Sequence, residues 1–232
     1  MLPHVSATEI ARNAEEIRER ISSAAGRRGR DAAGVRIVAA AKTVDVGRVR
    51  WAAAAGITSV GHNYVQELSV ARAALADVAL RWHYIGALRS GTATKVADLS
   101  DVVETVSGER AARRLAGRAA RSGRVLEVLI EVDFTGTRSG VPPDRVPATA
   151  DLLASLEGIH LGGLMTVAPL GETEEAARPW FARLRELRDR VSRTHPDVLE
   201  LSMGMSLDYQ VAVEEGATMV RIGTALFGPR PT

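Results

Sequence analysis

Lys42 is the residue of this sequence best suited to covalent chemistry. Of the thirty basic residues only two are lysines, Lys42 and Lys95, and the rest are arginines. Arginine stays protonated in proteins, whereas a lysine taken out of water can lose its proton and attack a carbonyl group. Lys42 directly follows an apolar run at 35–41, which suits either the end of a buried strand or a surface position before the next helix. The scarcity of lysine favours a functional role for Lys42.

Two segments near the C-terminus carry the groups of an anion site. Residues 201–206 read Leu-Ser-Met-Gly-Met-Ser and lead into an expected helix, whose free backbone N–H groups would lie beside the Ser206 hydroxyl. The second segment, 221–224, ends in Gly223 and Thr224. Ser206 could instead be an ordinary helix N-cap and Gly223 an ordinary turn. Together with a lysine on the same face of the fold, however, the two segments indicate a phosphorylated aldehyde as the ligand.

Arg221 is a charged residue between two apolar ones, Val220 and Ile222. Alternation along a strand places it on the opposite face from them, so it points inward if they pack outward under helices. A buried guanidinium needs an acceptor, which could be a pyridine nitrogen or the carboxylate of Glu131 or Asp133. An arginine that faces a pyridine nitrogen keeps it unprotonated, which makes the ring a poorer electron sink than an aspartate partner would.

Two further polar residues lie in or after expected strands. Asn63 follows the second strand and could hydrogen-bond a ring hydroxyl. His83 lies inside the third strand, where a core histidine with a hydrogen-bond partner is the more common interpretation.

These candidate residues can form one site only if the fold brings the ends of several strands together on one face. Short apolar runs alternate with helical patterns, which predicts βαβ units and a parallel sheet. Eight runs with seven intervening helices predict an α/β fold, a single (β/α)8 TIM-type barrel over residues 1–232, with an extra N-terminal helix at about 6–28. The expected strands are 35–41, 57–61, 80–86, 102–106, 125–132, 159–166, 198–203 and 219–223, and the expected helices between them are around 45–55, 64–77, 89–98, 108–122, 143–156, 173–194 and 206–215. Active sites of such barrels lie at the C-terminal ends of the strands.

Composition excludes several classes of protein. The 232 residues, 46% of them hydrophobic, are enough for a full core, and the absence of cysteine excludes disulfides and thiolate metal sites, so we expect no metal. No apolar run approaches the ~20 residues of a membrane span, and the polar N-terminus does not resemble a signal peptide, so a cytoplasmic protein without membrane contact is expected. Arginines alternate with acidic residues, as at 183–190, which is typical of a solvated helix and does not indicate nucleic-acid binding.

The motifs in their order along the chain resemble the pyridoxal phosphate homeostasis protein family, single-domain relatives of the alanine racemase barrel. The matching segments cover about residues 35–230. They are VAAAKT at 38–43, GHNYVQE at 61–67, WHYIG at 82–86, RSGV at 138–141, GLM at 163–165, LSMGMS at 201–206 and GATMVRIGTALFG at 216–228.

This resemblance implies a cofactor and a set of site residues. Pyridoxal 5′-phosphate (PLP), the active form of vitamin B6, would be held as a Schiff base on Lys42, with Arg221 near its pyridine nitrogen. Its phosphate would be bound by Ser206, Gly223 and Thr224. The resemblance also places Asn63 and Met165 against the cofactor, and it implies a role in balancing the free PLP pool without established turnover, so no catalytic residue is assigned.

The chain departs from the family pattern at three places. His62 stands where the family usually has glutamate, Arg138 stands where lysine is common, and residues 87–92 replace a segment that tends to carry glutamine, asparagine and lysine. Secondary cofactor contacts or a partner surface near residues 62, 89–92 and 138 are therefore in question, whereas the Lys42 and phosphate assignments are not.

Two other activities compete with a carrier role. A PLP-dependent amino-acid racemase needs a base on each face of the bound substrate, and in racemases with this barrel the second base comes from an added C-terminal domain that does not follow the eighth strand here. A PLP-free Schiff-base aldolase would also use a barrel lysine and a phosphate site, but it would be colourless. We expect a monomer that binds PLP and, as further partners, PLP-dependent apoenzymes.

Overall fold

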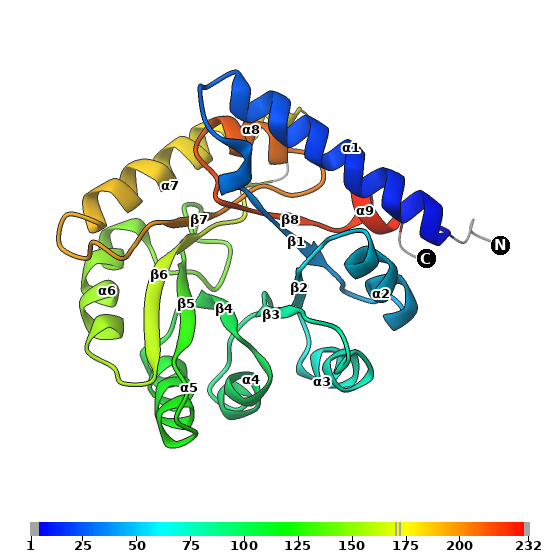
Figure 1. The fold of residues 1–232 in the computed structure, drawn as a ribbon. Helices are drawn as coiled ribbons and strands as arrows, with labels where there is room; N and C mark the ends of the chain where they lie inside the picture. Colours follow the sequence, from blue (N-terminus) through cyan, green and yellow to red (C-terminus); the bar gives the residue numbers. More distant parts are fainter. Residues whose placement is uncertain (1–4, 170, 172, 230–232) are drawn as a thin grey trace.

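A closed barrel of parallel strands forms the centre of the molecule (Figure 1). The computed structural model describes residues 5–169, 171 and 173–229. Within them, eight strands pair in sequence order and β8 closes the barrel on β1. The TIM-type barrel predicted from the sequence is confirmed. Seven of the expected strands contain an observed one, and the remaining one, expected at 57–61, overlaps β2, which extends one residue further to His62. The strands are β1 (Arg36–Ala40), β2 (Ser59–His62), β3 (Arg81–Tyr84), β4 (Val102–Val106), β5 (Leu126–Glu131), β6 (Ile159–Met165), β7 (Glu200–Ser202) and β8 (Met219–Ile222).

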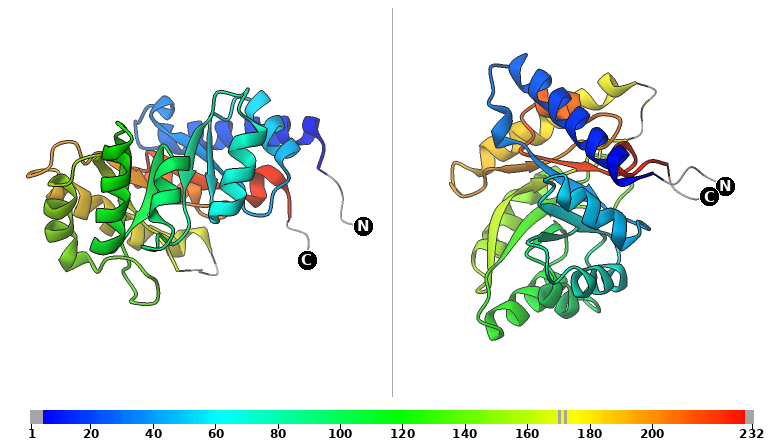
Figure 2. Two further views of the ribbon diagram at one scale, coloured as in Figure 1. Left: turned by 90° about the horizontal axis from the view of Figure 1, so that it is seen from below. Right: turned by 45° about the vertical axis from the view of Figure 1, so that its right-hand side comes forward.

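Helices surround the barrel, as the views in Figures 1 and 2 show. Each of the first seven strands is followed by a helix, which returns the chain to the N-terminal end of the next strand. The α-helices are α1 (Ala7–Gly26), α2 (Val46–Ala54), α3 (Val65–Ala74), α4 (Ala93–Leu99), α5 (Glu109–Arg121), α6 (Val146–Ala154), α7 (Arg178–Val191), α8 (Tyr209–Glu214) and α9 (Thr224–Phe227), and the 3₁₀ helices are η1 (Ala32–Gly34), η2 (Pro143–Arg145) and η3 (Glu174–Ala177).

Helix α1 is the extra N-terminal helix that the sequence predicts. It begins at a capping box, in which the Ser6 hydroxyl accepts from the Glu9 N–H and the Glu9 carboxylate accepts from the Ser6 N–H. Its buried residues recur at helical spacing along one face, at Ile10, Ala14, Ile17 and beyond. This face packs against α2, α8 and α9, so α1 covers the side of the barrel where α8 and α9 are short.

The barrel interior is apolar in the middle and charged at both ends. Val38, Leu129, Met165 and Met219 pack together inside it, separate from the larger core between strands and helices. At the N-terminal end, arginines pair with glutamates, namely Arg36 with Glu200 and Arg81 with Glu127. At the C-terminal end lie the buried polar side chains of His83, Glu104, Ser202 and Arg221. The apolar layer therefore separates two polar layers, of which only the second lies where barrels carry their sites.

Three short helices differ from expectation. The helix expected from residue 206 begins at Tyr209, and the one expected from residue 89 begins at Ala93 after a turn. Helix α9, directly after β8, was not among the predicted helices. A four-residue helix is too short to produce a periodic pattern in the sequence.

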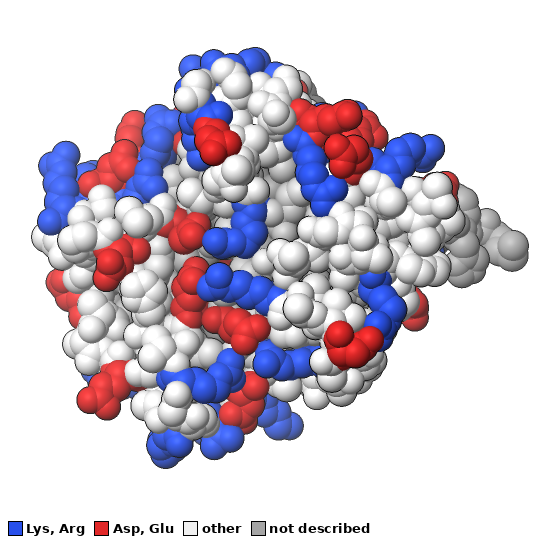
Figure 3. All heavy atoms as spheres, in the orientation of Figure 1, with Lys and Arg blue, Asp and Glu red and all other residues white. Residues whose placement is uncertain are grey.

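The surface is charged but mixed. On the face seen in Figure 3, basic and acidic side chains lie close together, which agrees with the alternation of charges in the sequence. Among the described residues, no helix combines the length and the apolar character that crossing a membrane would require.

Candidate functional site

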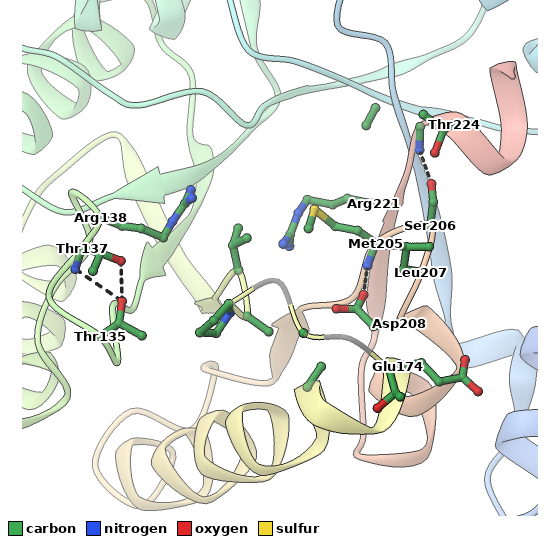
Figure 4. A pocket seen from close by; sticks show the side chains of 18 residues that line it. Thr135, Thr137, Arg138, Glu174, Met205, Ser206, Leu207, Asp208, Arg221 and Thr224 are labelled. Carbon is green, nitrogen blue, oxygen red and sulfur yellow. Dashed lines mark hydrogen bonds between the residues drawn. The ribbon is translucent and has the colours of Figure 1, made fainter. Parts of the chain in front are cut away.

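A cavity of about 940 Å³ opens at the C-terminal end of the barrel strands. This volume lies within the roughly 300–1,000 Å³ typical of small-molecule sites. Four of the seven binding residues predicted from the sequence line it: Ser206, Arg221, Gly223 and Thr224. Figure 4 shows Arg221 pointing into the space between the loop of Thr135–Arg138 and the turn of Met205–Asp208. The cavity lining comes from the ends of β1 and β8 and the loops after β5, β6, β7 and β8, and consists of Ala40, Thr135, Thr137, Arg138, Val167, Ala168, Pro169, Gly171, Thr173, Glu174, Ala177, Met205, Ser206, Leu207, Asp208, Arg221, Gly223 and Thr224.

Ser206 joins the loops that follow β7 and β8. Its Oγ accepts hydrogen bonds from the backbone N–H groups of Gly223, at 3.3 Å, and Ala225, at 3.2 Å, at the start of α9. The placement of Ser206 at the N-terminus of α8 is wrong, because Asp208 precedes that helix and accepts from the Met205 N–H at 2.6 Å, which closes a turn. The N-cap alternative for Ser206 is thereby excluded for α8. Its hydroxyl instead lies beside Gly223, one of the other residues predicted to bind phosphate.

Gly204 makes this turn possible. Its φ of +90° is a conformation that side-chain-bearing residues rarely adopt. A Cβ at this position would also lie 2.5 Å from the Cβ of Ala212 and 2.9 Å from the Cα of Tyr209. Glycine is therefore required for the chain to reverse closely enough to bring Ser206 to the cavity.

Arg221 is buried, with 4% of its surface exposed, and points inward as alternation predicts. Its Nη1 donates to Ser202 Oγ at 2.6 Å and its Nη2 donates to the Thr166 carbonyl at 2.7 Å. Glu104 Oε2 lies 3.9 Å from Nη1 and is the nearest carboxylate among the described residues. Burial lowers the pKa of Arg221 and the charge of Glu104 counteracts this, while the ordinary pKa of a guanidinium is so high that it stays charged.

The carboxylates considered as acceptors for Arg221, Glu131 and Asp133, are engaged elsewhere. Glu131 Oε1 accepts from the Arg138 guanidinium at 3.2 Å. Asp133 accepts from the backbone N–H groups of Thr135 and Arg138, and these bonds lower its pKa although burial opposes them. The structure thus corrects this part of the sequence interpretation. The two carboxylates bind groups of the loop after β5, and Arg221 has a different acidic partner.

That partner belongs to a hydrogen-bonded chain inside the barrel. Glu104 Oε2 accepts from Ser202 Oγ at 2.5 Å, and Glu104 Oε1 lies 2.6 Å from His83 Nδ1. His83 and Glu104 have no exposed surface. Burial raises the pKa of Glu104, but the hydrogen bond to His83, the charge of Arg221 and the hydrogen bond from Ser202 together hold it below its ordinary value. His83 is thus the core histidine expected, whereas Glu104 was not among the candidate residues.

Lys42 lies just past the end of β1, as predicted, on the face where the cavity opens. It is half-buried, and its Nζ lies 5.5 Å from the centre of the Tyr64 ring. The next residue, Thr43, has a φ of +60° and its hydroxyl donates to the Lys42 carbonyl at 2.7 Å, which fixes a sharp bend. Lys42 is not among the cavity-lining residues, although Ala40, two positions earlier, is. Lys95, in contrast, is exposed on the outer helix α4.

Asn63 and Met165 also lie outside the cavity lining. Asn63 follows β2, and its Nδ2 donates to the Ile85 carbonyl at 3.4 Å. Met165 is at the end of β6, buried in the apolar layer with Val38 and Leu129. Of the predicted set, the structure therefore joins the residues predicted to bind phosphate with Arg221 in one cavity and leaves Lys42, Asn63 and Met165 outside its lining.

Comparison with known proteins shows the family of this chain. Residues 5–231 match the family model of the alanine racemase N-terminal domain. The pyridoxal phosphate homeostasis protein of Aquifex aeolicus is 39% identical over 215 residues, which cover 91% of this chain and 94% of that protein. The protein of the same name from Pseudomonas aeruginosa is 39% identical over 223 residues, 95% of this chain and 96% of that one. The chain belongs to the pyridoxal phosphate homeostasis protein family.

A solved structure of this family adds the cofactor. PipY from Synechococcus elongatus PCC7942, determined with PLP bound, is 35% identical and superposes with a TM-score of 0.81, over 91% of this chain and all of that one. PipY is thus a PLP-binding barrel of the same family, close enough in fold for its chemistry to guide a proposal for this protein.

Two of the three departures from the family pattern lie away from the cavity. His62 is buried on the outer side of β2, stacked against Trp82 with ring centres 6.2 Å apart, and residues 89–92 form the turn before α4. Arg138 does line the cavity, held by Glu131. Of the three, only the exchange of the family's common lysine for arginine at position 138 therefore changes the chemistry of the cavity wall.

Proposed function

We propose that this protein binds PLP as a Schiff base on Lys42 and that it buffers or delivers the cofactor without catalysing a reaction with it. The observation that carries the proposal is the single cavity in which Ser206, Gly223 and Thr224 lie with Arg221, at the barrel end where Lys42 follows β1. The name of the relatives and the PLP in PipY support it.

The donor groups in the cavity fit a phosphorylated pyridine aldehyde. The hydroxyls of Ser206 and Thr224 and the backbone N–H groups that begin α9 can bind phosphate oxygens, and Arg221 supplies a guanidinium for the ring. Two carboxylates, Asp208 and Glu174, also line the cavity. Burial raises the pKa of Asp208, which weakens its opposition to an anion. PLP would contribute an aldehyde for Lys42 and a ring able to delocalise negative charge.

The cavity wall offers little for racemisation. Apart from Lys42, which the proposal places on the cofactor, the titratable residues of the wall, among those described, are Arg138, Glu174, Asp208 and Arg221, with no second lysine, histidine or tyrosine as a base for the opposite face. Arg221 opposite a pyridine nitrogen would also weaken the ring as an electron sink. Both features support binding over turnover.

Borohydride reduction of the PLP-loaded protein tests the proposal. The wild-type protein should be yellow, lose its visible absorption on reduction, and yield a PLP-modified peptide that contains Lys42. The Lys42→Ala variant should give no adduct, and the matched variant Lys95→Ala, which removes the other lysine, should give the same adduct as the wild type. An adduct on Lys95, or none on the wild-type protein, would contradict the assignment.

Incubation of the loaded protein with L-alanine separates the carrier from the racemase. Sustained formation of D-alanine would replace the proposed carrier with the alternative activity. A protein that stays colourless with excess PLP would instead favour a cofactor-free aldolase. Transfer of PLP to apoenzymes, the monomeric state and a cytoplasmic location stay predictions, open to transfer assays, light scattering and cell fractionation.

A further inference from the structure

A buried chain of polar side chains connects Arg221 to the opposite wall of the barrel. It runs from Arg221 on β8 to Ser202 on β7, Glu104 on β4 and His83 on β3, with successive contacts of 2.6, 2.5 and 2.6 Å. Three of the four residues have no exposed surface, and Arg221 has 4%. Buried charges persist only when they are paired and hydrogen-bonded. It therefore matters which of these four side chains are charged.

The hydrogen-bond pattern indicates which members are charged. His83 Nε2 has no hydrogen-bond partner among the described residues, so a protonated ring would bury an unpaired N–H. A neutral ring that donates through Nδ1 to Glu104 leaves only an unused acceptor, which costs less. Glu104, with donors at both oxygens, is then the anion, and Arg221, 3.9 Å away, is the cation. The four side chains together therefore carry no net charge.

From this geometry we infer that Glu104 is the counter-ion of Arg221 and that its charge tunes the electrostatic potential of the cavity. Ser202 and His83 are positioning residues, which hold the Glu104 carboxylate in place. Glu104 lies behind Arg221, inside the barrel, while the cavity lies in front. Arg221 therefore presents its N–H groups to a ligand with most of its charge offset. This inference rests on the proposed function, because it assigns to these residues the tuning of the proposed PLP site.

Other charged groups near Arg221 do not replace Glu104. Asp208, Glu131 and Arg138 all influence its charge, but Asp208 and Arg138 line the open cavity and Glu131 is paired with Arg138. Their opposite signs partly cancel one another. Of the described carboxylates, Glu104 alone lies within 4 Å of the guanidinium.

The Glu104→Gln variant tests the inference because it changes the charge by one while its amide can still bond Ser202 and His83. At an effective dielectric constant near 20, one charge at roughly 10 Å changes an ion's binding by about tenfold and a pKa by about one unit. The affinity of the PLP-free protein for inorganic phosphate, measured by calorimetry, should rise by about tenfold. In the PLP-loaded protein, the pH at which visible absorption gives way to near-ultraviolet absorption should fall by about one unit.

Glu127→Gln is the matched control, because Glu127 is also inside the barrel and paired with an arginine, but at the N-terminal end. It should change neither measurement. Glu104→Asp, which restores the charge, should bring both values back toward those of the wild type.

The outcomes separate this inference from the proposed function. If the wild type binds phosphate and PLP but Glu104→Gln matches it in both measurements, Glu104 does not tune the site and only this inference fails. If the wild type binds neither ligand, the proposed function fails with it. Should Glu104→Gln not fold, the double variant Glu104→Gln/Arg221→Gln decides: recovered folding supports the pairing of two buried charges, and continued misfolding overturns it.

Discussion

Lowering the pH from 7 to 5 is expected to destabilise the folded protein by about 2 kcal/mol through His62 alone. The His62 side chain is 2% exposed, and neither of its ring nitrogens has a hydrogen-bond partner among the described residues. The nearest carboxylate oxygen, Glu67 Oε2, lies 3.9 Å from Nδ1, beyond hydrogen-bond distance. The desolvation of the ring therefore dominates, and the folded state holds His62 in its neutral form.

The magnitude follows from the pKa. Burial lowers the pKa of His62 from 6.5 to about 4, so between these values the unfolded chain binds a proton that the folded protein does not. The stability that neutral His62 contributes is thus fully present above pH 6.5 and is lost as the pH falls toward 4. At 1.36 kcal/mol per unit the full loss is about 3 kcal/mol, of which about 2 kcal/mol falls between pH 7 and 5.

Urea unfolding of the PLP-free protein at pH 7, 6 and 5 measures this loss. In the His62→Phe variant, whose ring can still stack on Trp82 but cannot titrate, the loss between pH 7 and 5 should shrink by about 2 kcal/mol. The exposed His160 provides the control, since His160→Gln should keep the wild-type dependence. An unchanged pH dependence in His62→Phe would refute the argument, because His62 could not then be the buried group that titrates.

Three further substitutions test the geometry of the site. Gly204→Ala should lower the unfolding free energy by roughly 2–4 kcal/mol, measured by urea unfolding, because its Cβ would lie 2.5 Å from that of Ala212 in a strained conformation. Ser206→Ala should weaken PLP binding about tenfold in equilibrium titrations, whereas the exposed Ser122→Ala should not. Lys42→Ala should keep the unfolding free energy of the PLP-free protein within about 0.5 kcal/mol of the wild type, since the side chain lies outside the packed layers; a larger loss would mean that Lys42 supports the fold.

The sequence predicted the barrel well because its signals are local and repeated. Each strand is a short apolar run, such as 35–41 around β1, and each is followed by a helical pattern long enough to show its period. Elements of only a few residues escape this reasoning. Helix α9 has four residues, and the start of α8 is set by the bond from the Met205 N–H to Asp208, which a serine at position 206 does not reveal.

The meeting of Ser206, Gly223 and Thr224 at one cavity was predictable for a similar reason. Ser206, Gly223 and Thr224 follow consecutive strands, and consecutive strands of a barrel are neighbours, so their loops must meet. Glu104 was missed although the sequence held a signal: a charged residue within the buried run Val-Val-Glu-Thr-Val. Because every residue of that run is buried, the sequence does not tell which of its side chains face the barrel interior. It also cannot show that Glu104 on β4 lies close to Arg221 on β8 across the barrel.

The two charged layers of the barrel differ in how their arginines are paired. At the N-terminal end each interior arginine has its own carboxylate beside it: Arg36 lies 3.4 Å from Glu200, and Arg81 lies 2.5 Å from Glu127. At the C-terminal end the carboxylate lies on one side of Arg221 and the cavity on the other, so the guanidinium keeps a free face. A buried guanidinium with a carboxylate on one side and a cavity on the other can donate hydrogen bonds to a ligand while its charge is partly offset.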